Sequence, residues 1–373
     1  MTDLSRVLDE HIARGTAPGI LVADGTAAGR LDITTAGDIA DDAILRIQSM
    51  TKPVTAVATL RLVQRGVLSL DDPVQQWLPE LADRRVLRTP TSPLTDTGPA
   101  DGPITVRHLL TNTSGYGMVA TPSPLKDAMI ANRTEASQDA VDMGAQEWLD
   151  ALADLPLAFH PGEGWRYHHS FGILGILLSR VTVGPLEEHL TADLFEPLGM
   201  ADTAYTVPTE KADRLPAAYR RDDQGALVEV EPPAGGFYLA PAPFDVSHAE
   251  LVSTARDYAV FARMLASGGV YEGERFVDPA LLGLMRTDQV ADALKTPDSF
   301  FPGFWDGVGW GFGVAVITTG EHAGRIGWSG GLGTDFFIDQ DGSFRIVLTQ
   351  MEMGPAVMGL FDDLQRLPVQ PLN

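Results

Sequence analysis

The spacing of hydrophobic residues divides the chain into three parts. In the first part it predicts a helix at 4–13 and strands at 19–23, 30–35 and 43–48, with residues 25–29 as a hairpin turn. In the middle part, apolar residues recur at every third and fourth position, which predicts helices at 105–112, 145–153, 170–182, 186–196 and 248–266. In the last part the period is two, which predicts strands at 311–318, 323–328, 334–338 and 343–350, then a helix fragment at 361–367.

Two segments depart from this scheme. Residues 50–64 are apolar on nearly every side and precede Arg65 and Gly66, which predicts a buried helix that ends at a glycine. Residues 84–104 are rich in Pro, Thr, Asp and Gly and have no apolar period, which predicts a surface loop.

Strands at both chain ends, with helices between them, predict one composite unit. We expect residues 1–72 and 255–373 to form an α/β half in which both termini share one sheet. Residues 73–254 are expected to form an inserted, mainly helical half. The predicted fold class is therefore α/β plus all-α.

Composition and charge narrow the range of partners. With 373 residues and 44% hydrophobic composition, the chain is long enough to bury a large core. Its net charge of −23 opposes binding to nucleic acid or to an anionic membrane surface, because both are negatively charged. No basic stretch followed by an apolar run opens the chain, and no segment approaches the ~18 apolar residues of a membrane span. We therefore expect a cytoplasmic protein with a small-molecule substrate; its oligomeric state is not indicated.

The absence of cysteine limits the chemistry. It excludes disulfides, a thiol nucleophile and cysteine-ligated metal sites, and leaves serine, threonine, lysine, tyrosine or carboxylates for covalent catalysis. The adjacent pair His168 and His169 does not suit a metal, because neighbouring helix residues face different directions and no further ligand spacing accompanies them. We predict no metal and no cofactor.

The tetrad Ser49-Met50-Thr51-Lys52 is the first candidate for nucleophilic chemistry. On a helix, residues three apart lie on one face at roughly 5–6 Å between Cβ atoms, so the Lys52 amine can reach the Ser49 hydroxyl. Burial and the positive end of the helix dipole both favour the neutral amine, which can accept the serine proton. The Ser49 N–H at a helix start is free to donate to an oxyanion. The plainer alternative is a helix cap with a lysine extended toward solvent.

Two other serines compete with Ser49. Ser123 also precedes a lysine by three positions, but proline follows it, which is typical of a helix N-cap. Ser329 stands in a Gly-x-Ser-x-Gly match, a motif that needs a helix after it and a later histidine. The residues after Ser329 have strand character, and no histidine follows His322. We therefore interpret residues 327–331 as a glycine-rich strand edge that a substrate can approach closely.

The tetrad, Tyr167-His168-His169 and Trp328-Ser329-Gly330-Gly331 occur in an order and spacing that resemble the β-lactamase-related serine hydrolases, most of all the family VIII carboxylesterases. The connecting stretches 66–73, 109–115 and 161–163 match as well, so the resemblance covers nearly the whole chain. It implies a β-lactamase/transpeptidase-like fold, with an antiparallel sheet flanked by helices and an inserted helical half.

The resemblance also implies roles for individual residues. Ser49 is the nucleophile, Tyr167 lies against it as a base, and the backbone N–H groups of Ser49 and Gly331 form the oxyanion hole. A Lys52 ammonium beside Tyr167 would favour a phenolate and make the two a proton-sharing pair. Which of them removes the serine proton stays open at this point. The alternative for Tyr167 is a core tyrosine whose hydroxyl is satisfied.

Two positions depart from the β-lactamase pattern. His169 stands where the related enzymes have an asparagine that holds a substrate amide, and we expect it to bond Lys52 or the substrate instead. Trp328 stands where most lactamases have the lysine that pairs with a β-lactam carboxylate, and it offers an apolar wall. Both changes favour uncharged esters over β-lactams. Plain core packing is the alternative for Trp328.

Aromatic residues crowd two further loops, at 300–312 and 237–238. Phe237 and Trp310, with His169, Trp328, Ser329 and Gly330, are our candidates for substrate binding; small core clusters beneath the loops are the alternative. The predicted function is a carboxylesterase. An acyltransferase or an amide-forming or amide-hydrolysing enzyme on the same fold is the nearest alternative, before a β-lactamase or D-Ala-D-Ala peptidase and a catalytically silent binding protein.

Overall fold

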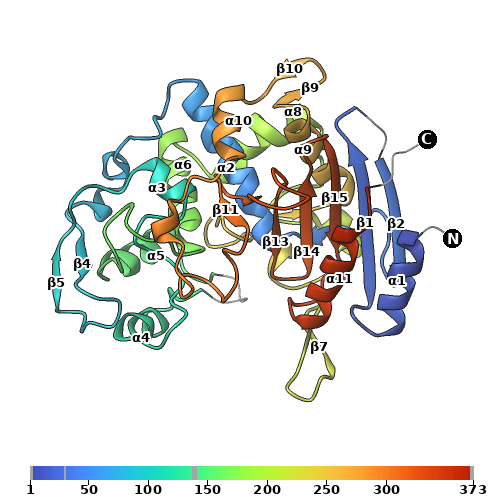
Figure 1. Cartoon of the computed structure of the whole chain (residues 1–373), viewed down its shortest axis with the longest axis horizontal. Helices are drawn as coiled ribbons and strands as arrows, with labels where there is room; N and C mark the ends of the chain where they lie inside the picture. Colours follow the sequence, from blue (N-terminus) through green and yellow to red (C-terminus); the bar gives the residue numbers. More distant parts are fainter. Residues whose placement is uncertain (1–2, 29–30, 137–140, 370–373) are drawn as a thin grey trace.

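The computed structural model describes residues 3–28, 31–136 and 141–369. Its main sheet has seven antiparallel strands in the order β11-β12-β13-β14-β15-β1-β2, so both ends of the chain share one sheet, as predicted (Figure 1). The strands are β1 (Gly19–Thr26), β2 (Leu31–Gly37), β11 (Val308–Trp310), β12 (Ala315–Ile317), β13 (Ile326–Gly330), β14 (Thr334–Ile338) and β15 (Ser343–Leu348). Positions 29 and 30 of the predicted hairpin lie outside the described residues.

Strand β1 is apolar at consecutive positions because both of its faces are covered. Side chains alternate along a strand, so Ile20 and Val22 face one layer and Leu21 and Ala23 the other. The first pair packs in a cluster with α1 (Asp3–Ala13) and α11 (Pro355–Arg366), and the second pair joins the central core with α9 (Ala255–Ala266). Figure 1 shows α1 and α11 side by side over the end of the sheet that β1 and β2 form.

A buried ion pair fastens the strands from the two chain ends to one another. Asp24 on β1 and Arg345 on β15 are paired in register, and the guanidinium Nε and Nη2 donate to the two carboxylate oxygens at 2.6 and 2.7 Å. Arg345 is 0% exposed and Asp24 is 3% exposed. The same guanidinium also donates to the carbonyls of Leu364 and Leu367 at the end of α11. The pair therefore connects both chain ends and the last helix.

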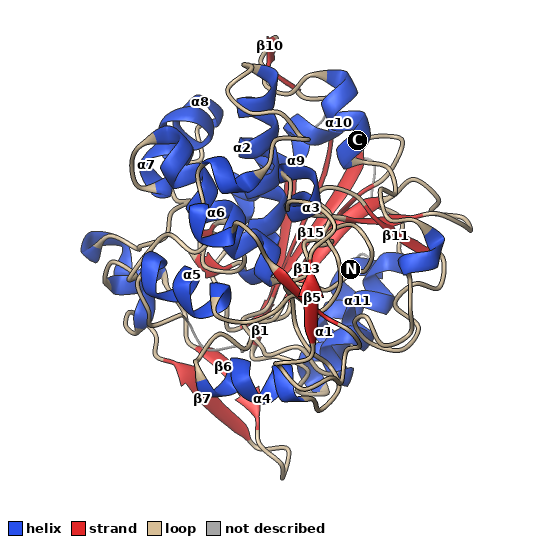
Figure 2. Cartoon of the chain, turned by 90° about the vertical axis from the view of Figure 1, so that its left-hand side faces the viewer, coloured by secondary structure: helices blue, strands red, loops and turns tan. Residues whose placement is uncertain are grey.

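Helix α2 (Thr51–Gln64) lies between the sheet and the helical part of the chain. It is buried from Thr51 to Leu60 without a break, which explains why its sequence lacks a polar face. It packs against α6 (His169–Thr182) and α10 (Pro279–Met285). The other helices are α3 (Val106–Leu110), α4 (Pro124–Ala131), α5 (Ala145–Ala153), α7 (Leu186–Leu190) and α8 (Glu196–Leu198), with a π-helical turn at Thr191–Phe195 (Figure 2).

Short strand pairs complete the fold: β3 (Leu45–Arg46) with β8 (Val252–Ser253), β4 (Arg85–Leu87) with β5 (Thr97–Pro99), β6 (Ala218–Arg221) with β7 (Leu227–Glu231), and β9 (Val270–Tyr271) with β10 (Glu274–Arg275). The β6–β7 hairpin projects from the body of the molecule (Figures 1 and 2). Among the described residues no single helix is long and apolar enough to cross a membrane, although α6 and the segment Leu186–Leu198, bent by 76°, together reach that length and composition.

Several predicted boundaries were wrong. The helix predicted at 248–266 begins only at Ala255, because the Thr254 hydroxyl caps it by accepting from the Asp257 N–H at 3.1 Å. Residues 84–104 are not a plain loop, since β4 and β5 lie within them and bury Val86 and Leu87. The strand predicted at 311–318 begins only at Ala315, because residues 311–314 form the turn between β11 and β12, in which Gly313 adopts φ +74°. The last helix begins at Pro355 rather than at 361.

Candidate active site

Ser49 lies in a short turn that connects the sheet side of the molecule to α2. The turn is a 3₁₀ helix, η1 (Gln48–Met50), so Ser49 precedes the first residue of α2 and does not lie within the helix itself. Lys52 is in the first turn of α2, and its Nζ lies 3.0 Å from the Ser49 Oγ. The predicted contact between serine and lysine is present, although the turn differs from the expected one.

Lys52 is completely buried. Its Nζ lies 2.6 Å from the backbone oxygen of His248, to which it donates, and 4.4 Å from the centre of the Tyr167 ring. Burial lowers the pKa of Lys52 well below its ordinary value, although Glu250 opposes this effect. A neutral amine can donate to the His248 carbonyl and accept from the Ser49 hydroxyl at the same time, so Lys52 is arranged as a base for Ser49.

Tyr167 precedes α6, and its hydroxyl is part of the same group. The Trp328 Nε1–H donates to the Tyr167 hydroxyl at 2.6 Å, and the tyrosine is 6% exposed. Burial raises the pKa of Tyr167 despite its hydrogen bonds with Ser49 and Trp328. Burial therefore favours the phenol form of Tyr167, which has a proton to donate. Burial of Lys52 disfavours the ammonium on which the expected phenolate depends, so the proton-sharing pair of Lys52 and Tyr167 stays a prediction.

Strand β13 carries the third motif and packs against η1. A Cβ on Gly330 would lie 2.5 Å from the Ile47 carbonyl oxygen and 2.8 Å from the Gln48 Cβ, so glycine permits the close approach of β13 to η1. In the described part of the chain, the N–H groups of Ser49 and Gly331 have no hydrogen-bond acceptor. Both are therefore free for the oxyanion role that the family resemblance implies.

We expect Gly330→Ala to lower both activity and stability. The added methyl group overlaps atoms of η1, so the turn or β13 must move, and a displacement near 1 Å at a catalytic group typically costs ~100-fold in rate. Overpacking adds about 1–3 kcal/mol of destabilisation. Thermal unfolding and esterase kinetics measure the two effects. Gly359→Ala in α11 is the control, because its Cβ meets no atom within 4 Å; equal behaviour of the two variants would refute the close-packing argument.

The competing serines have structural roles. Ser123 caps α4, where its Oγ accepts from the Lys126 N–H at 3.2 Å, as predicted. The Ser329 Oγ donates to the Asp335 carboxylate at 2.7 Å across the β13–β14 pair. A turn and a strand follow Ser329, so the strand-and-helix context of a nucleophile elbow is missing.

Two of the other predicted substrate-binding residues, His169 and Trp310, are buried. His169 is buried, its Nε2 lies 2.6 Å from the Thr134 carbonyl oxygen, and its ring stacks on Trp148. Its expected hydrogen bond to Lys52 is therefore not formed. Trp310 is 0% exposed, and its ring meets Trp328 edge to face at 4.7 Å. Trp310 therefore packs beneath Trp328 and has no surface for a substrate.

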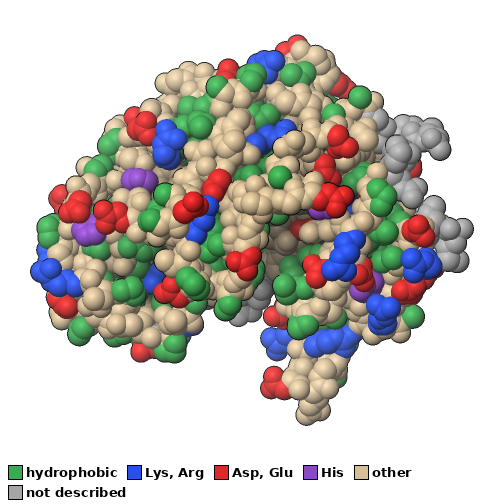
Figure 3. Space-filling view, viewed as in Figure 1, with side chains coloured by type: hydrophobic (Ala, Val, Ile, Leu, Met, Phe, Trp, Pro, Cys, Tyr) green, Lys and Arg blue, Asp and Glu red, His purple; other side chains and the backbone are tan. Residues whose placement is uncertain are grey.

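Phe237 lines a cavity of about 420 Å³ beside the site. It is also lined by Gln48, His168 and Leu332, which are the sequence neighbours of Ser49, Tyr167 and Gly331. His248, whose backbone oxygen accepts from Lys52, lines it as well. Figure 3 shows the surface hollowed between the helical part and the sheet, above the projecting β6–β7 hairpin, whose Arg220 and Val230 line the same cavity.

Sequence reasoning missed the groups on the far side of this cavity. Glu250 is 4% exposed, and its pKa is raised by burial to about 8. Its Oε1 lies 3.3 Å from the His248 Nε2, and the His248 ring lies 3.9 Å from that of His168. Gln48 and His168 have φ of +51° and +94°, strained values for residues with side chains. No motif marks these residues, since contacts between distant segments bring them together.

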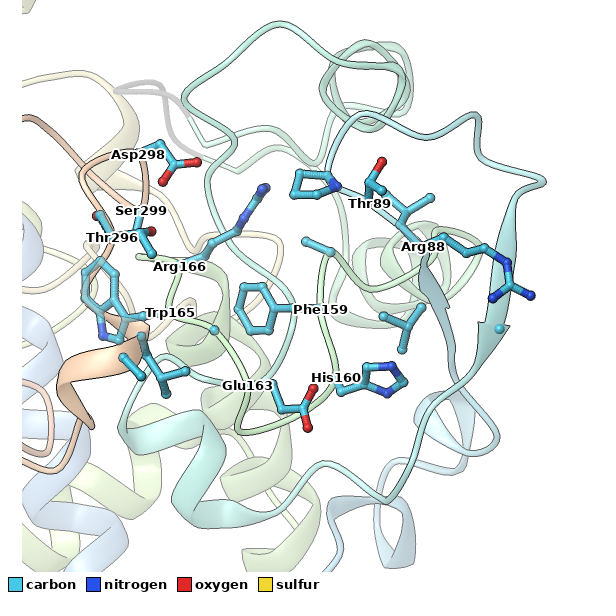
Figure 4. Close-up of a pocket in the computed structure, with 18 residues that line it drawn as sticks. Arg88, Thr89, Phe159, His160, Glu163, Trp165, Arg166, Thr296, Asp298 and Ser299 are labelled. Atoms are coloured by element: carbon cyan, nitrogen blue, oxygen red, sulfur yellow. The ribbon is translucent and has the colours of Figure 1, made fainter.

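A second cavity, of about 500 Å³, lies beside the cluster of aromatic side chains to which Trp165 and Tyr167 belong (Figure 4). Trp165 lines it and stacks on Tyr167 at 6.2 Å between ring centres, so the tryptophan separates this cavity from the nucleophile. Figure 4 shows Arg166 and Phe159 in its middle, with Asp298 on one side. His160 and Glu163 line this cavity. Together with Asp101 they form a group in which one potential metal-ligand atom of each side chain lies within 4.8 Å of the other two.

Comparison with known proteins adds to this geometry. A family model described as Beta-lactamase matches residues 4–368. Esterase EstB of Burkholderia gladioli is 31% identical over 337 residues, which cover 86% of this chain and 81% of EstB. The acyltransferase calJ of Penicillium decumbens is 28% identical over 261 residues, 68% of this chain and 59% of calJ. The solved structure of EstCE1, a hydrolase with promiscuous acyltransferase activity, matches with a TM-score of 0.78 at 24% identity and 96% coverage of both chains.

Proposed function

The chain belongs to the beta-lactamase family of serine hydrolases, and we propose that it is a carboxylesterase that cleaves small uncharged esters through an acyl-enzyme on Ser49. The observation that carries the proposal is the 3.0 Å distance between the Ser49 Oγ and the amine of a fully buried lysine. A hydroxyl within reach of a neutral base is the arrangement that nucleophilic acyl transfer needs. The esterase EstB, at 31% identity, supports the same reaction.

Acylation begins when Lys52 removes the proton of Ser49. The Ser49 O–H bond breaks while its oxygen attacks the ester carbonyl carbon, and the proton forms a new N–H bond on Lys52. The carbonyl oxygen becomes an oxyanion and accepts from the N–H groups of Ser49 and Gly331. Removing one such donor typically costs about 3 kcal/mol in the barrier.

Tyr167 serves as the acid for the leaving alcohol. Its phenol proton passes to the alcohol oxygen as the ester C–O bond breaks, and the extra proton of Lys52 then replaces it on Tyr167. Trp328 supports this role because its Nε1–H donates to the same hydroxyl at 2.6 Å. Water then attacks the acyl-enzyme with the groups acting in reverse order, and the acid is released.

Turnover of p-nitrophenyl acetate and butyrate tests the proposal. We expect a burst of p-nitrophenol followed by steady release, because the acyl-enzyme accumulates before water removes it. No release above the buffer rate contradicts an esterase. Nitrocefin turnover at matching efficiency favours a β-lactamase instead, and folded protein that a fluorophosphonate fails to label at Ser49 favours a silent binding protein.

An acyltransferase is the second candidate function, and the match to calJ favours it. The two reactions share the acyl-enzyme and differ in whether water or another alcohol removes the acyl group. Adding small alcohols to the ester assay separates them. A transferase gives new ester at the expense of free acid at low alcohol concentration, whereas an esterase continues to release mainly acid.

We expect Trp328→Phe to reduce kcat by about 5- to 10-fold, the equivalent of one lost hydrogen bond of ~1 kcal/mol. Phenylalanine keeps an aromatic ring against Trp310 but removes the donor to the Tyr167 hydroxyl. Steady-state kinetics with p-nitrophenyl butyrate measure the change. The control is Trp305→Phe, because the Trp305 Nε1 donates to Ser299, a residue on the same loop. Equal loss in both variants would mean that the hydrogen bond to Tyr167 has no special role.

A further inference from the structure

The direct contacts of Lys52 include no negative charge that would stabilise its ammonium form. Whenever it holds the Ser49 proton it is an ammonium, yet its side chain is completely buried. Its direct hydrogen-bond partners are the Ser49 hydroxyl and the His248 carbonyl, and no carboxylate of the described chain lies within ion-pair distance of its Nζ. A buried ammonium without a countercharge is costly, so a nearby anion would make Lys52 a better base.

The segment that contacts Lys52 also carries a buried acid. The His248 backbone oxygen accepts from Lys52 at 2.6 Å, and Glu250 follows two residues later. The Glu250 Oε2 accepts from the Ala249 N–H at 2.8 Å, and its Oε1 lies 3.3 Å from the His248 Nε2. One three-residue segment therefore contacts the amine through its backbone and places a carboxyl group against its imidazole ring.

The His248 ring has little freedom to release this carboxyl group. It lies 3.9 Å from the ring of His168, and a Cβ on Gly172 of α6 would come within 2.9 Å of its Nδ1. Trp148 packs against it at 6.3 Å. The ring is therefore held between α5, α6 and the segment before α6, and Glu250 is held with it.

Glu250 and Lys52 are the two members of this group whose charge can change. Burial lowers the pKa values of the neighbouring histidines at 168, 169 and 248, which keeps them neutral. Burial raises the pKa values of the tyrosines at 167, 205 and 238, which keeps these phenols neutral as well. Glu250 and Lys52 each favour the charged form of the other, so they titrate as a coupled pair.

We propose that Glu250, which packs against His248 and accepts from the Ala249 N–H, is the countercharge for Lys52 and acts as a positioning residue in the activation of Ser49. This inference rests on the role of Lys52 in the proposed function. In the active form, Glu250 is a carboxylate and Lys52 is neutral. The Ser49 O–H bond breaks, its electron pair becomes the nucleophile, and its proton forms an N–H bond on Lys52, whose new positive charge the Glu250 carboxylate stabilises. No other proton is needed.

The test is the pH dependence of Ser49 labelling by a fluorophosphonate, since labelling requires an activated serine but no particular ester. In wild type the rate rises as the coupled pair loses protons. In Glu250→Gln the anion that favours the ammonium is gone, so Lys52 becomes neutral at lower pH. We expect the rising limb to move down by about one pH unit or more, and the plateau to fall about 10-fold because the amine is a weaker base.

Two more variants make the result specific. Glu250→Asp keeps the carboxylate on a side chain that is shorter by one methylene group. The rise of its labelling rate with pH should therefore lie between those of wild type and Glu250→Gln. This variant keeps the test valid if the glutamine variant folds poorly. Glu352→Gln removes another carboxylate that lines the same cavity, and its limb should coincide with that of wild type. Near-ultraviolet circular dichroism checks that each variant is folded.

The outcomes separate this inference from the proposed function. If Glu250→Gln is labelled more slowly at every pH but the pH at which its rate rises is unchanged, Glu250 has only a structural role and the inference is overturned. Wild type that is labelled at Ser49 but turns over no ester defeats the esterase proposal and leaves the Glu250 test intact. Wild type that is not labelled at all defeats the role of Lys52 as a base, and the countercharge with it.

Discussion

Replacement of Ser49 by alanine should abolish ester hydrolysis, with kcat lower by a factor on the order of 10⁴ or more. The alanine side chain has no oxygen to form the acyl-enzyme, and the remaining oxyanion donors stabilise only attack by water. The change removes one hydroxyl from a half-buried turn, so the fold should be retained. Burst and steady-state kinetics with p-nitrophenyl butyrate, together with mass spectrometry for the acyl adduct, measure the loss.

The competing serines supply matched controls for Ser49. Ser123→Ala removes a helix cap and should cost about 1 kcal/mol of stability while leaving kcat unchanged. Ser329→Ala removes the hydrogen bond to Asp335 and should retain the burst. If Ser49→Ala keeps wild-type turnover while Ser329→Ala loses it, the nucleophile has been assigned to the wrong residue.

The largest effect on stability is expected for Asp24→Ala, about 3–5 kcal/mol. The substitution leaves the Arg345 guanidinium buried without its carboxylate, at a point where β1, β15 and the end of α11 meet. Chemical denaturation of wild type and variant gives the difference in the free energy of unfolding.

Two further variants test whether burial is the reason. Arg6→Ala breaks the exposed Arg6–Glu10 pair of α1 and should change stability by no more than about 0.5 kcal/mol. The double variant Asp24→Leu with Arg345→Met replaces both charges by apolar groups and should recover most of the loss. A double variant as unstable as Asp24→Ala would mean that the ion pair itself, and not the unpaired charge, accounts for the effect.

The fold and the family were accessible from the sequence because they depend on local patterns. The tetrad at Ser49 needs only three-residue spacing, and the family it resembles is confirmed by the model that matches residues 4–368. The sheet shared by both chain ends followed from the change in hydrophobic period, and the seven-stranded antiparallel sheet confirms it. The catalytic roles of Ser49, Lys52 and Tyr167 stay predictions until kinetics test them, as does the division into halves near residues 72 and 255.

The protonation states and packing contacts of the site residues could not be predicted from the sequence, because they depend on burial and on contacts between distant segments. The phenolate expected at Tyr167 assumed a Lys52 ammonium, whereas complete burial disfavours that ion. Trp310 and Trp328 both lie in glycine-rich stretches of the sequence, and only the packing shows that Trp310 lies beneath Trp328. Glu250 carries no motif, since its importance arises from the contact of Lys52 with the His248 carbonyl.

The sheet shared by the two chain ends also has a consequence for protein synthesis. The nucleophile turn follows β3, whereas β13, which packs against it, and β15, which pairs with β1, come from the last part of the chain. A ribosome must therefore release the chain past β13 before the oxyanion donors can meet Ser49, and long-range closure of this kind is slow. Nascent or truncated chains that end before β13 should consequently be inactive, so that hydrolysis appears only after this strand has been synthesised.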